Sequence, residues 1–129
     1  MRPSAAEQGK RAAILAESLY LANLTVLPVI GFFLLVCLHL SGVAQASALA
    51  RCHLRQAISG SLWAGVLLVV LNAVILILGG YRSPATIVTL ILYFFSVHTA
   101  LILIGMAGLA KATASQRFVY PLIGRRCDD

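Results

Sequence analysis

The stretch QAISGSLWAGVLLVVLNAVILILGGY, residues 56–81, decides the fold because it holds no charged residue. Two further uncharged runs flank it, at residues 18–50 and 83–110. Each run exceeds the roughly 20 apolar residues with which a helix crosses about 30 Å of hydrocarbon. The sequence therefore predicts an all-α integral membrane bundle of three transmembrane helices.

Composition places the chain in the membrane class, since 60% of its 129 residues are hydrophobic. The formal net charge is +6, but the ten Lys and Arg lie almost entirely outside the uncharged runs, where topology signals and lipid headgroups place them. We therefore expect contacts with membrane lipids and no binding of nucleic acid. The three cysteines, Cys37, Cys52 and Cys127, lack the spacing of zinc, redox or disulfide sites, so we predict packing or surface roles.

The first uncharged run is predicted to form helix one, from about Ser18 to Ser41, with a kink at Pro28 because proline removes a backbone donor. Residues 1–17 form a polar, basic lead-in at the headgroup level, and residues 18–110 form the transmembrane domain. A cleavable signal peptide ending at Ala44-Gln45-Ala46 is the alternative. Because the apolar run exceeds the roughly 7 to 15 residues of a signal peptide, we predict a retained helix.

A short interfacial helix is predicted over residues 42–55, because Arg51 and Arg55 lie four residues apart and give it one polar face. Helix two then covers residues 57–78. Residues 111–129 form a basic, aromatic tail, in which proline and glycine argue against a fourth helix.

The connection between helices two and three is predicted to be a tight turn. Gly79 and Gly80 close helix two, and Ser83 and Pro84 supply the N-cap and first-turn proline of helix three. So short a connection makes the two helices antiparallel neighbours. Small residues are expected to let their backbones approach closely at the end away from the turn. These residues are Gly60, Ser61, Ala64 and Gly65 of helix two, and Gly105 and Gly108 of helix three.

The distribution of cations predicts the orientation. Three crossings place the N-terminus and Arg82 on one side, with Arg2, Lys10 and Arg11, and the other six cations on the opposite side. The more basic side of a membrane protein is usually cytoplasmic. The C-terminus is therefore predicted to be cytoplasmic.

Two motifs resemble a family of small bacterial membrane proteins described as Tic-twenty-like, after a component of the chloroplast import machinery. The first is the sequence HLRQAI at residues 53–58, and the second is Lys111-Ala112 followed by FVYPLI at residues 118–123. Pro28 also fits. Leu54 stands where the family usually has alanine. The resemblance implies a membrane protein of three helices, and the family itself has no settled activity.

The uncharged runs contain two asparagines and two histidines: Asn23, His39, Asn72 and His98. The two histidines differ in predicted depth by on the order of 10 Å, which argues against shared haem ligation. We expect them to hydrogen-bond to a neighbouring helix or partner subunit. The asparagines are expected to bond between helices, since helices two and three hold no acidic residue for a transport path.

The densest polar cluster, His53, Arg55 and Gln56, opens helix two. Interfacial anchoring is one interpretation, and docking of an anionic lipid headgroup or an acidic partner surface is the other. The residues predicted for docking are Arg51, His53, Arg55, Gln56, Arg117, Tyr120, Arg125 and Arg126.

These features predict a protein that is not an enzyme and holds no cofactor or metal. We expect an accessory or scaffolding subunit of a larger complex in the bacterial inner membrane, stabilising it through helix packing and lipid contacts. An oligomeric channel or translocation component is the alternative, and a haem-binding electron-transfer subunit is the second.

Overall fold

The computed structural model describes residues 2–127, a part of the chain in which every regular element is helical. Met1 and the last two residues of the predicted tail, Asp128 and Asp129, lie outside the described residues. The elements in chain order are α1 (Ala5–Thr25), α2 (Ile30–Leu40), the 3₁₀ turn η1 (Val43–Ala46), α3 (Ala48–Gly65), the π-helical turn η2 (Val66–Val70), α4 (Leu71–Gly79) and α5 (Pro84–Thr113). The all-α prediction is confirmed.

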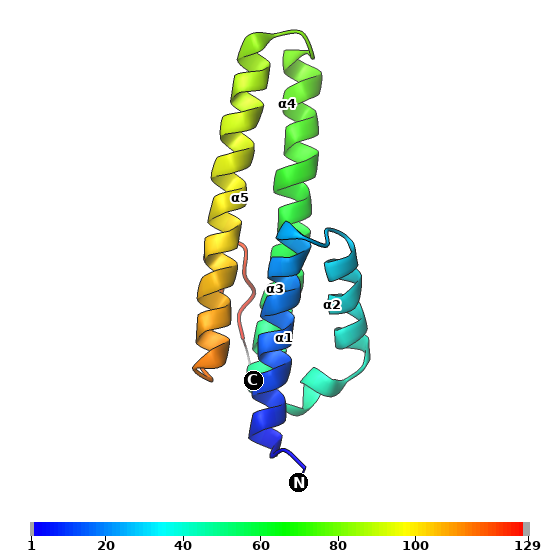
Figure 1. Ribbon diagram of the computed structural model, residues 1–129, viewed down its shortest axis with the longest axis vertical. Helices are drawn as coiled ribbons and strands as arrows, with labels where there is room; N and C mark the ends of the chain where they lie inside the picture. Colours follow the sequence, from blue (N-terminus) through cyan, green and yellow to red (C-terminus); the bar gives the residue numbers. More distant parts are fainter. Residues whose placement is uncertain (1, 128–129) are drawn as a thin grey trace.

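Two helices are long and apolar enough to cross a membrane. The first, Ala48–Gly79, joins α3, η2 and α4 over 32 residues, and the second is α5, with 30 residues. At 1.5 Å per residue they measure about 48 Å and 45 Å. Figure 1 shows them as neighbouring rods, with α1, α2 and the C-terminal tail packed against the half that is distant from their connecting turn.

The turn between the rods has the local chemistry that the sequence predicts. Gly80 takes a φ of 81°, which glycine adopts without steric cost. The Ser83 hydroxyl accepts the backbone N–H of Thr86 at 3.4 Å, and Pro84 opens α5. The two rods are therefore antiparallel neighbours, as expected.

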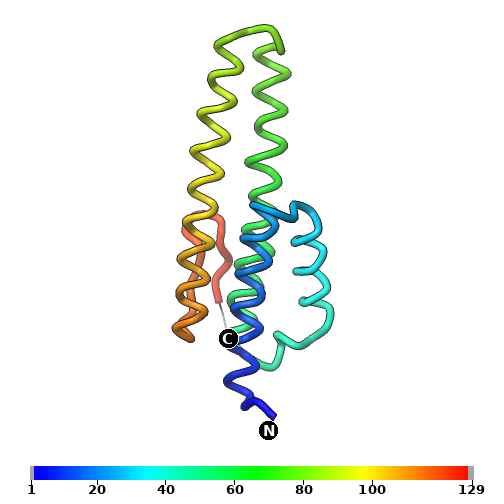
Figure 2. Tube along the Cα trace, viewed as in Figure 1, coloured from blue at the N-terminus to red at the C-terminus, as the bar shows by residue number. Residues whose placement is uncertain are grey.

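The first uncharged run does not form one continuous helix, so that prediction is wrong. α1 ends at Thr25, and α2 runs back beside it from Ile30 (Figure 2). The Asn23 side-chain oxygen accepts the backbone N–H groups of Val29 at 3.0 Å and of Phe32 at 3.2 Å. Because this side chain satisfies donors that a broken helix leaves free, the segment around Pro28 reverses the chain instead of kinking it.

Two neighbouring segments also differ from their predicted bounds. The expected lead-in is part of α1, which Ser4 caps through a reciprocal pair of hydrogen bonds with Glu7. The expected interfacial helix is reduced to η1. Arg51 and Arg55 instead belong to the first turns of α3, whose N-cap is Ser47.

Helix η2 widens the first rod where it leaves the bundle. Its backbone bonds skip one residue further than in an α-helix, as in the bond from Leu71 N–H to Val66 O. Two side chains bond to carbonyls in this turn: Tyr93 donates to Leu67 O at 2.8 Å, and Asn72 donates to Leu68 O at 2.8 Å. The wide turn therefore sits at a point where polar side chains support the backbone.

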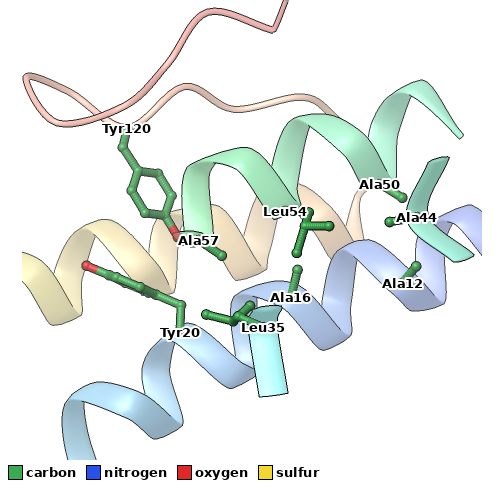
Figure 3. Packing of buried hydrophobic residues seen from close by; sticks show 9 residues of the cluster. All are labelled: Ala12, Ala16, Tyr20, Leu35, Ala44, Ala50, Leu54, Ala57 and Tyr120. Atoms are coloured by element: carbon green, nitrogen blue, oxygen red, sulfur yellow. The ribbon is translucent and has the colours of Figure 1, made fainter. Parts of the chain in front are cut away.

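The core lies in the half of the molecule that holds α1, where α1, α2, η1, α3 and the tail meet (Figure 3). Glycines admit its two large rings, since a Cβ on Gly60 would lie 2.8 Å from both Tyr20 and Tyr120, and one on Gly105 would lie 2.6 Å from Tyr20. A Cβ on Gly65 would meet nothing within 4 Å. The small residues therefore make room for α1 and the tail, and the expectation of close contact at Gly65 is wrong.

These contacts predict opposite outcomes for two glycines. Gly105→Ala forces a methyl group against the Tyr20 ring and is expected to lower the free energy of unfolding by about 1–3 kcal/mol. Gly65→Ala, the matched control, is expected to be neutral or stabilising because alanine favours helix. Thermal unfolding in detergent, followed by circular dichroism, measures both. Equal stability of the two variants would contradict the packing described here.

Candidate functional site

A buried carboxylate, Glu17, joins three parts of the chain. One carboxylate oxygen lies 2.6 Å from His53 Nδ1 of α3, and the other accepts the hydroxyl of Tyr120 in the tail. The side chains of Glu17 and His53 have no solvent exposure, and Tyr120 is 1% exposed. A Cβ added to Gly108 of α5 would lie 2.6 Å from the carboxylate, so α5 closes the remaining side. We call Glu17, His53 and Tyr120 the buried polar chain.

The hydrogen-bonding capacity of its groups determines the net charge of the buried polar chain. His53 Nε2 lies 2.8 Å from the backbone oxygen of Gln116, and because a carbonyl only accepts, Nε2 carries a proton. One further proton lies between Nδ1 and Glu17, giving either an imidazolium with a carboxylate or two neutral groups. Both arrangements have zero net charge, which suits a site closed to water.

Burial also affects the third member. Burial away from water is the main cause that raises the pKa of Tyr120 above its ordinary value. The nearby Glu17 carboxyl group adds to this effect. The phenol therefore keeps its proton at neutral pH and serves as a hydrogen-bond donor. The buried polar chain can hold a proton and fix the tail, but no substrate reaches it in this conformation.

Gln56 and Ser59 attach the rest of the tail to α3. The Gln56 side-chain oxygen accepts the backbone N–H groups of Tyr120 and Arg125, both at 3.2 Å, and its amide nitrogen donates to Arg125 O. Ser59 donates to Ile123 O at 2.7 Å. Beyond α5, the described part of the tail forms no helix or sheet, so these side-chain bonds satisfy several of its backbone groups. They also place Arg125 beside α3.

A disulfide between Cys52 and Cys127 also joins the tail to α3, with a Cα–Cα distance of 5.1 Å. The expectation that the cysteines serve only packing or surface roles is wrong for this pair. Cys37 is free and exposed. The pairing was not visible in the sequence because the two residues are 75 positions apart.

The residues predicted for docking separate into two groups. His53, Gln56 and Tyr120 are buried and hold the protein together, so they present nothing to a lipid or partner. Arg55 and Arg125 are exposed, and they line one cavity of about 490 Å³ between α2, α3 and the tail. We call this cavity the basic groove.

The remaining predicted cations lie around or beyond the basic groove. Arg51 lines an adjoining cavity of about 150 Å³, which shares His39 and Arg55 with the basic groove. Its guanidinium donates to Gln45 O at 2.6 Å and so also holds η1. Arg117 and Arg126 are exposed on the tail.

The two histidines that the sequence predicts to lie within the membrane are not brought together. His39 is in α2 and lines the basic groove, whereas His98 is in α5, lies 2.9 Å from Leu24 O and packs against the Phe94 ring. These two helices lie on opposite sides of α1 (Figure 1). The geometry does not fit a haem between this pair.

The other predicted polar and small residues lie near the α1–α2 turn and beyond it. Ser61, Ala64 and Gly65 line a cavity of about 320 Å³ beside Asn23, and the buried Ser61 hydroxyl has no hydrogen-bond partner among the described residues. Asn72 lies further along the first rod, in a groove of about 410 Å³ between α4 and α5.

Comparison with protein-family models, with curated proteins and with solved structures finds no match to this chain. The resemblance to the Tic-twenty-like family therefore stays a prediction. The two segments that carry it, residues 53–58 and 118–123, lie against each other through Gln56 and the buried polar chain, and Ser59, which follows the first segment, donates to Ile123 O.

Sequence reasoning missed Glu17, the residue that both segments reach. Glu17 is 36 positions from His53 and 103 from Tyr120, so no local spacing connects them. One signal was present: it is an acidic residue at the edge of an uncharged run. Such residues are rarely left without a partner.

The buried polar chain predicts a large effect for a small change. Tyr120→Phe leaves a Glu17 oxygen buried without its donor, so the free energy of unfolding should fall by about 1–3 kcal/mol. The tail amides should also exchange faster with deuterium. Tyr81→Phe is the matched control, because Tyr81 is 75% exposed in the turn, and it should change neither measurement. A Tyr120→Phe protein as stable as the wild type would refute the assigned role.

Proposed function

We propose that this chain is an accessory or scaffolding subunit of a larger complex in the bacterial inner membrane, and that it is not an enzyme. Support for the proposal comes from the sparse packing at the end of the molecule that lies opposite to the termini. There, α4 packs only against α5 and η2 within the described part of the chain. We call residues 66–97 the membrane arm, a pair of helices that extends beyond α1 and α2 (Figure 1).

The observation that best supports the subunit proposal is a polar side chain in an apolar groove of the membrane arm. The groove lies between α4 and α5, and its apolar walls include Leu76, Ile91 and Phe95. Within the described residues, Asn72 makes one side-chain hydrogen bond, to Leu68 O of its own helix. Its oxygen and second N–H are therefore available to another helix, and such interhelical bonds are favourable in hydrocarbon. A helix of a partner subunit supplies both the bond and the apolar cover.

The orientation proposed here follows from the distribution of cations. Arg82 is in the turn, whereas the other nine Lys and Arg lie in the opposite half, just before α1, in α1, at the start of α3, at the end of α5 or in the tail (Figure 1). A bias of this size favours a cytoplasmic C-terminus. With the α1–α2 hairpin folded back, the N-terminus is proposed to lie on the same side, which gives this orientation two crossings.

The α1–α2 hairpin is proposed to enter the membrane from this basic side and turn back inside it. His98, which contacts Leu24 near the turn, lies about 21 Å along α5 from Pro84 at 1.5 Å per residue. This depth is within about 30 Å of hydrocarbon, where a non-helical backbone needs protein partners. Asn23 supplies them.

The proposed orientation also has a consequence for the disulfide between Cys52 and Cys127. Cytosolic glutathione keeps most thiols reduced, so in the proposed orientation the Cys52–Cys127 disulfide of the structure would be reduced to two thiols in the cell. The tail would then be held by Gln56, Ser59 and the buried polar chain.

Site-specific photocrosslinking in native membranes tests the subunit proposal. A photoreactive side chain at Ile91, inside the groove of the arm, should give one defined adduct with another membrane protein that also copurifies in stoichiometric amount. The matched control is Val88, which is exposed on the same helix but does not line the groove. It should give only lipid adducts. Asn72→Leu should reduce the Ile91 adduct several-fold, whereas Val74→Leu should not.

The same experiment distinguishes the alternatives. An adduct between two copies of this chain would favour the oligomeric channel, since two crossings cannot enclose a pore alone. Lipid adducts alone at both positions would contradict both proposals.

A further inference from the structure

The basic groove combines cations and apolar walls in a defined order. Arg55, Ile58 and Leu62 follow each other at intervals of three and four residues, which places them on one face of α3. Trp63 continues the wall, about 12 Å beyond Arg55 along the helix axis. Leu62 and Trp63 are 55% and 46% exposed. The groove is therefore cationic at the end towards the termini and apolar towards the membrane arm.

Two separate elements place the guanidinium groups in the groove. Arg55 belongs to α3, and Arg125 belongs to the tail, where Gln56 bonds to both its backbone N–H and its backbone oxygen. His39, from the last turn of α2, forms part of the lining. Since the groove uses three elements of the fold, it exists only when the tail is attached to α3.

The described part of the chain does not neutralise this charge. Its two acidic residues are Glu7, which caps α1, and Glu17, which is enclosed in the buried polar chain. Neither Arg55 nor Arg125 forms an ion pair with them. An anion is the complementary occupant, and planar guanidinium groups bind phosphate oxygens in pairs.

We propose that the basic groove binds one anionic phospholipid. The headgroup phosphate lies between Arg55 and Arg125, with His39 at the margin, and one acyl chain lies along Ile58, Leu62 and Trp63. The length of the apolar wall favours a lipid over a soluble phosphate, which would leave Leu62 and Trp63 in contact with water. This site shares no lining residue with the groove of the membrane arm, so its lipid and the proposed partner subunit contact different side chains.

Lipid binding to the purified full chain in a non-ionic detergent tests the proposal. Native mass spectrometry should show one retained dioleoyl phosphatidylglycerol per chain, with dioleoyl phosphatidylcholine bound at least tenfold more weakly. The double variant Arg55→Ala, Arg125→Ala should weaken phosphatidylglycerol binding about 30-fold, because each cation near the membrane surface contributes a substantial part of the attraction.

The matched control is Arg2→Ala, Arg11→Ala, which removes the same charge from exposed positions that do not line the basic groove. It should bind phosphatidylglycerol like the wild type. An equal loss in both double variants would show diffuse attraction and overturn the site. Equal binding of the two lipids would do the same, as would displacement of phosphatidylglycerol by equimolar inorganic phosphate.

A second variant tests the apolar wall even if the double arginine variant fails to fold. Leu62→Asn changes an exposed side chain outside the buried polar chain and the disulfide. It should weaken binding of dioleoyl phosphatidylglycerol about tenfold while the circular dichroism melting curve stays unchanged. Undiminished binding would contradict the proposed place of the acyl chain.

Discussion

The Glu17 carboxylate is the contact on which the arrangement of the helices depends. It connects α1 to α3 through His53 and to the tail through Tyr120, while Gly108 brings α5 against it. A carboxylate without partners in so closed a place would be strongly destabilising. The site therefore contributes specificity, because a shift of α1 along α3 would separate the Glu17 carboxyl group from His53. The tail, which has no helix of its own, is fixed by the same requirement.

A related requirement explains the reversal after α1. Each backbone N–H freed by breaking a helix needs a new acceptor, and hydrocarbon supplies none. Asn23 provides one oxygen for two such groups, and Leu24 O lies 2.9 Å from His98 Nε2 of α5. The uncharged run is long enough to span, but the polar residues within it support a turn. Its length alone therefore does not determine the number of crossings.

Local signals in the sequence predicted local structure well. The turn from Gly79 to Pro84 follows from glycine and proline preferences that act over a few residues, and the long rods follow from their apolar composition. Pro28 predicts a kink from sequence alone, because proline occurs both in kinked helices and in chain reversals. Only the contacts of Asn23 distinguish the reversal from a kink. Local spacing gave no information about which residues meet across α1, α3 and the tail.

The candidate sites show the same division. The sequence predicts Arg55 and Arg125 as docking cations, but the groove that they share depends on the hydrogen bonds between Gln56 and the tail. His53, Gln56 and Tyr120 were grouped with them because polar residues near a membrane surface look alike in sequence. Burial separates the two groups, and burial is decided by tertiary contacts. The pairing of Cys52 with Cys127 was unpredictable for the same reason.

The most direct test of this account is the side of the membrane on which each end of the chain lies. Gln8→Cys, Thr113→Cys and Tyr81→Cys, each in an otherwise cysteine-free protein, place single thiols at exposed positions near the N-terminus, at the end of α5 and in the turn. A membrane-impermeant maleimide, applied to intact cells and to inverted vesicles, reports the side of each. The folded-back hairpin predicts that residues 8 and 113 are labelled from one side and residue 81 from the other. Labelling of residue 8 from the same side as residue 81 would show a third crossing and contradict the account.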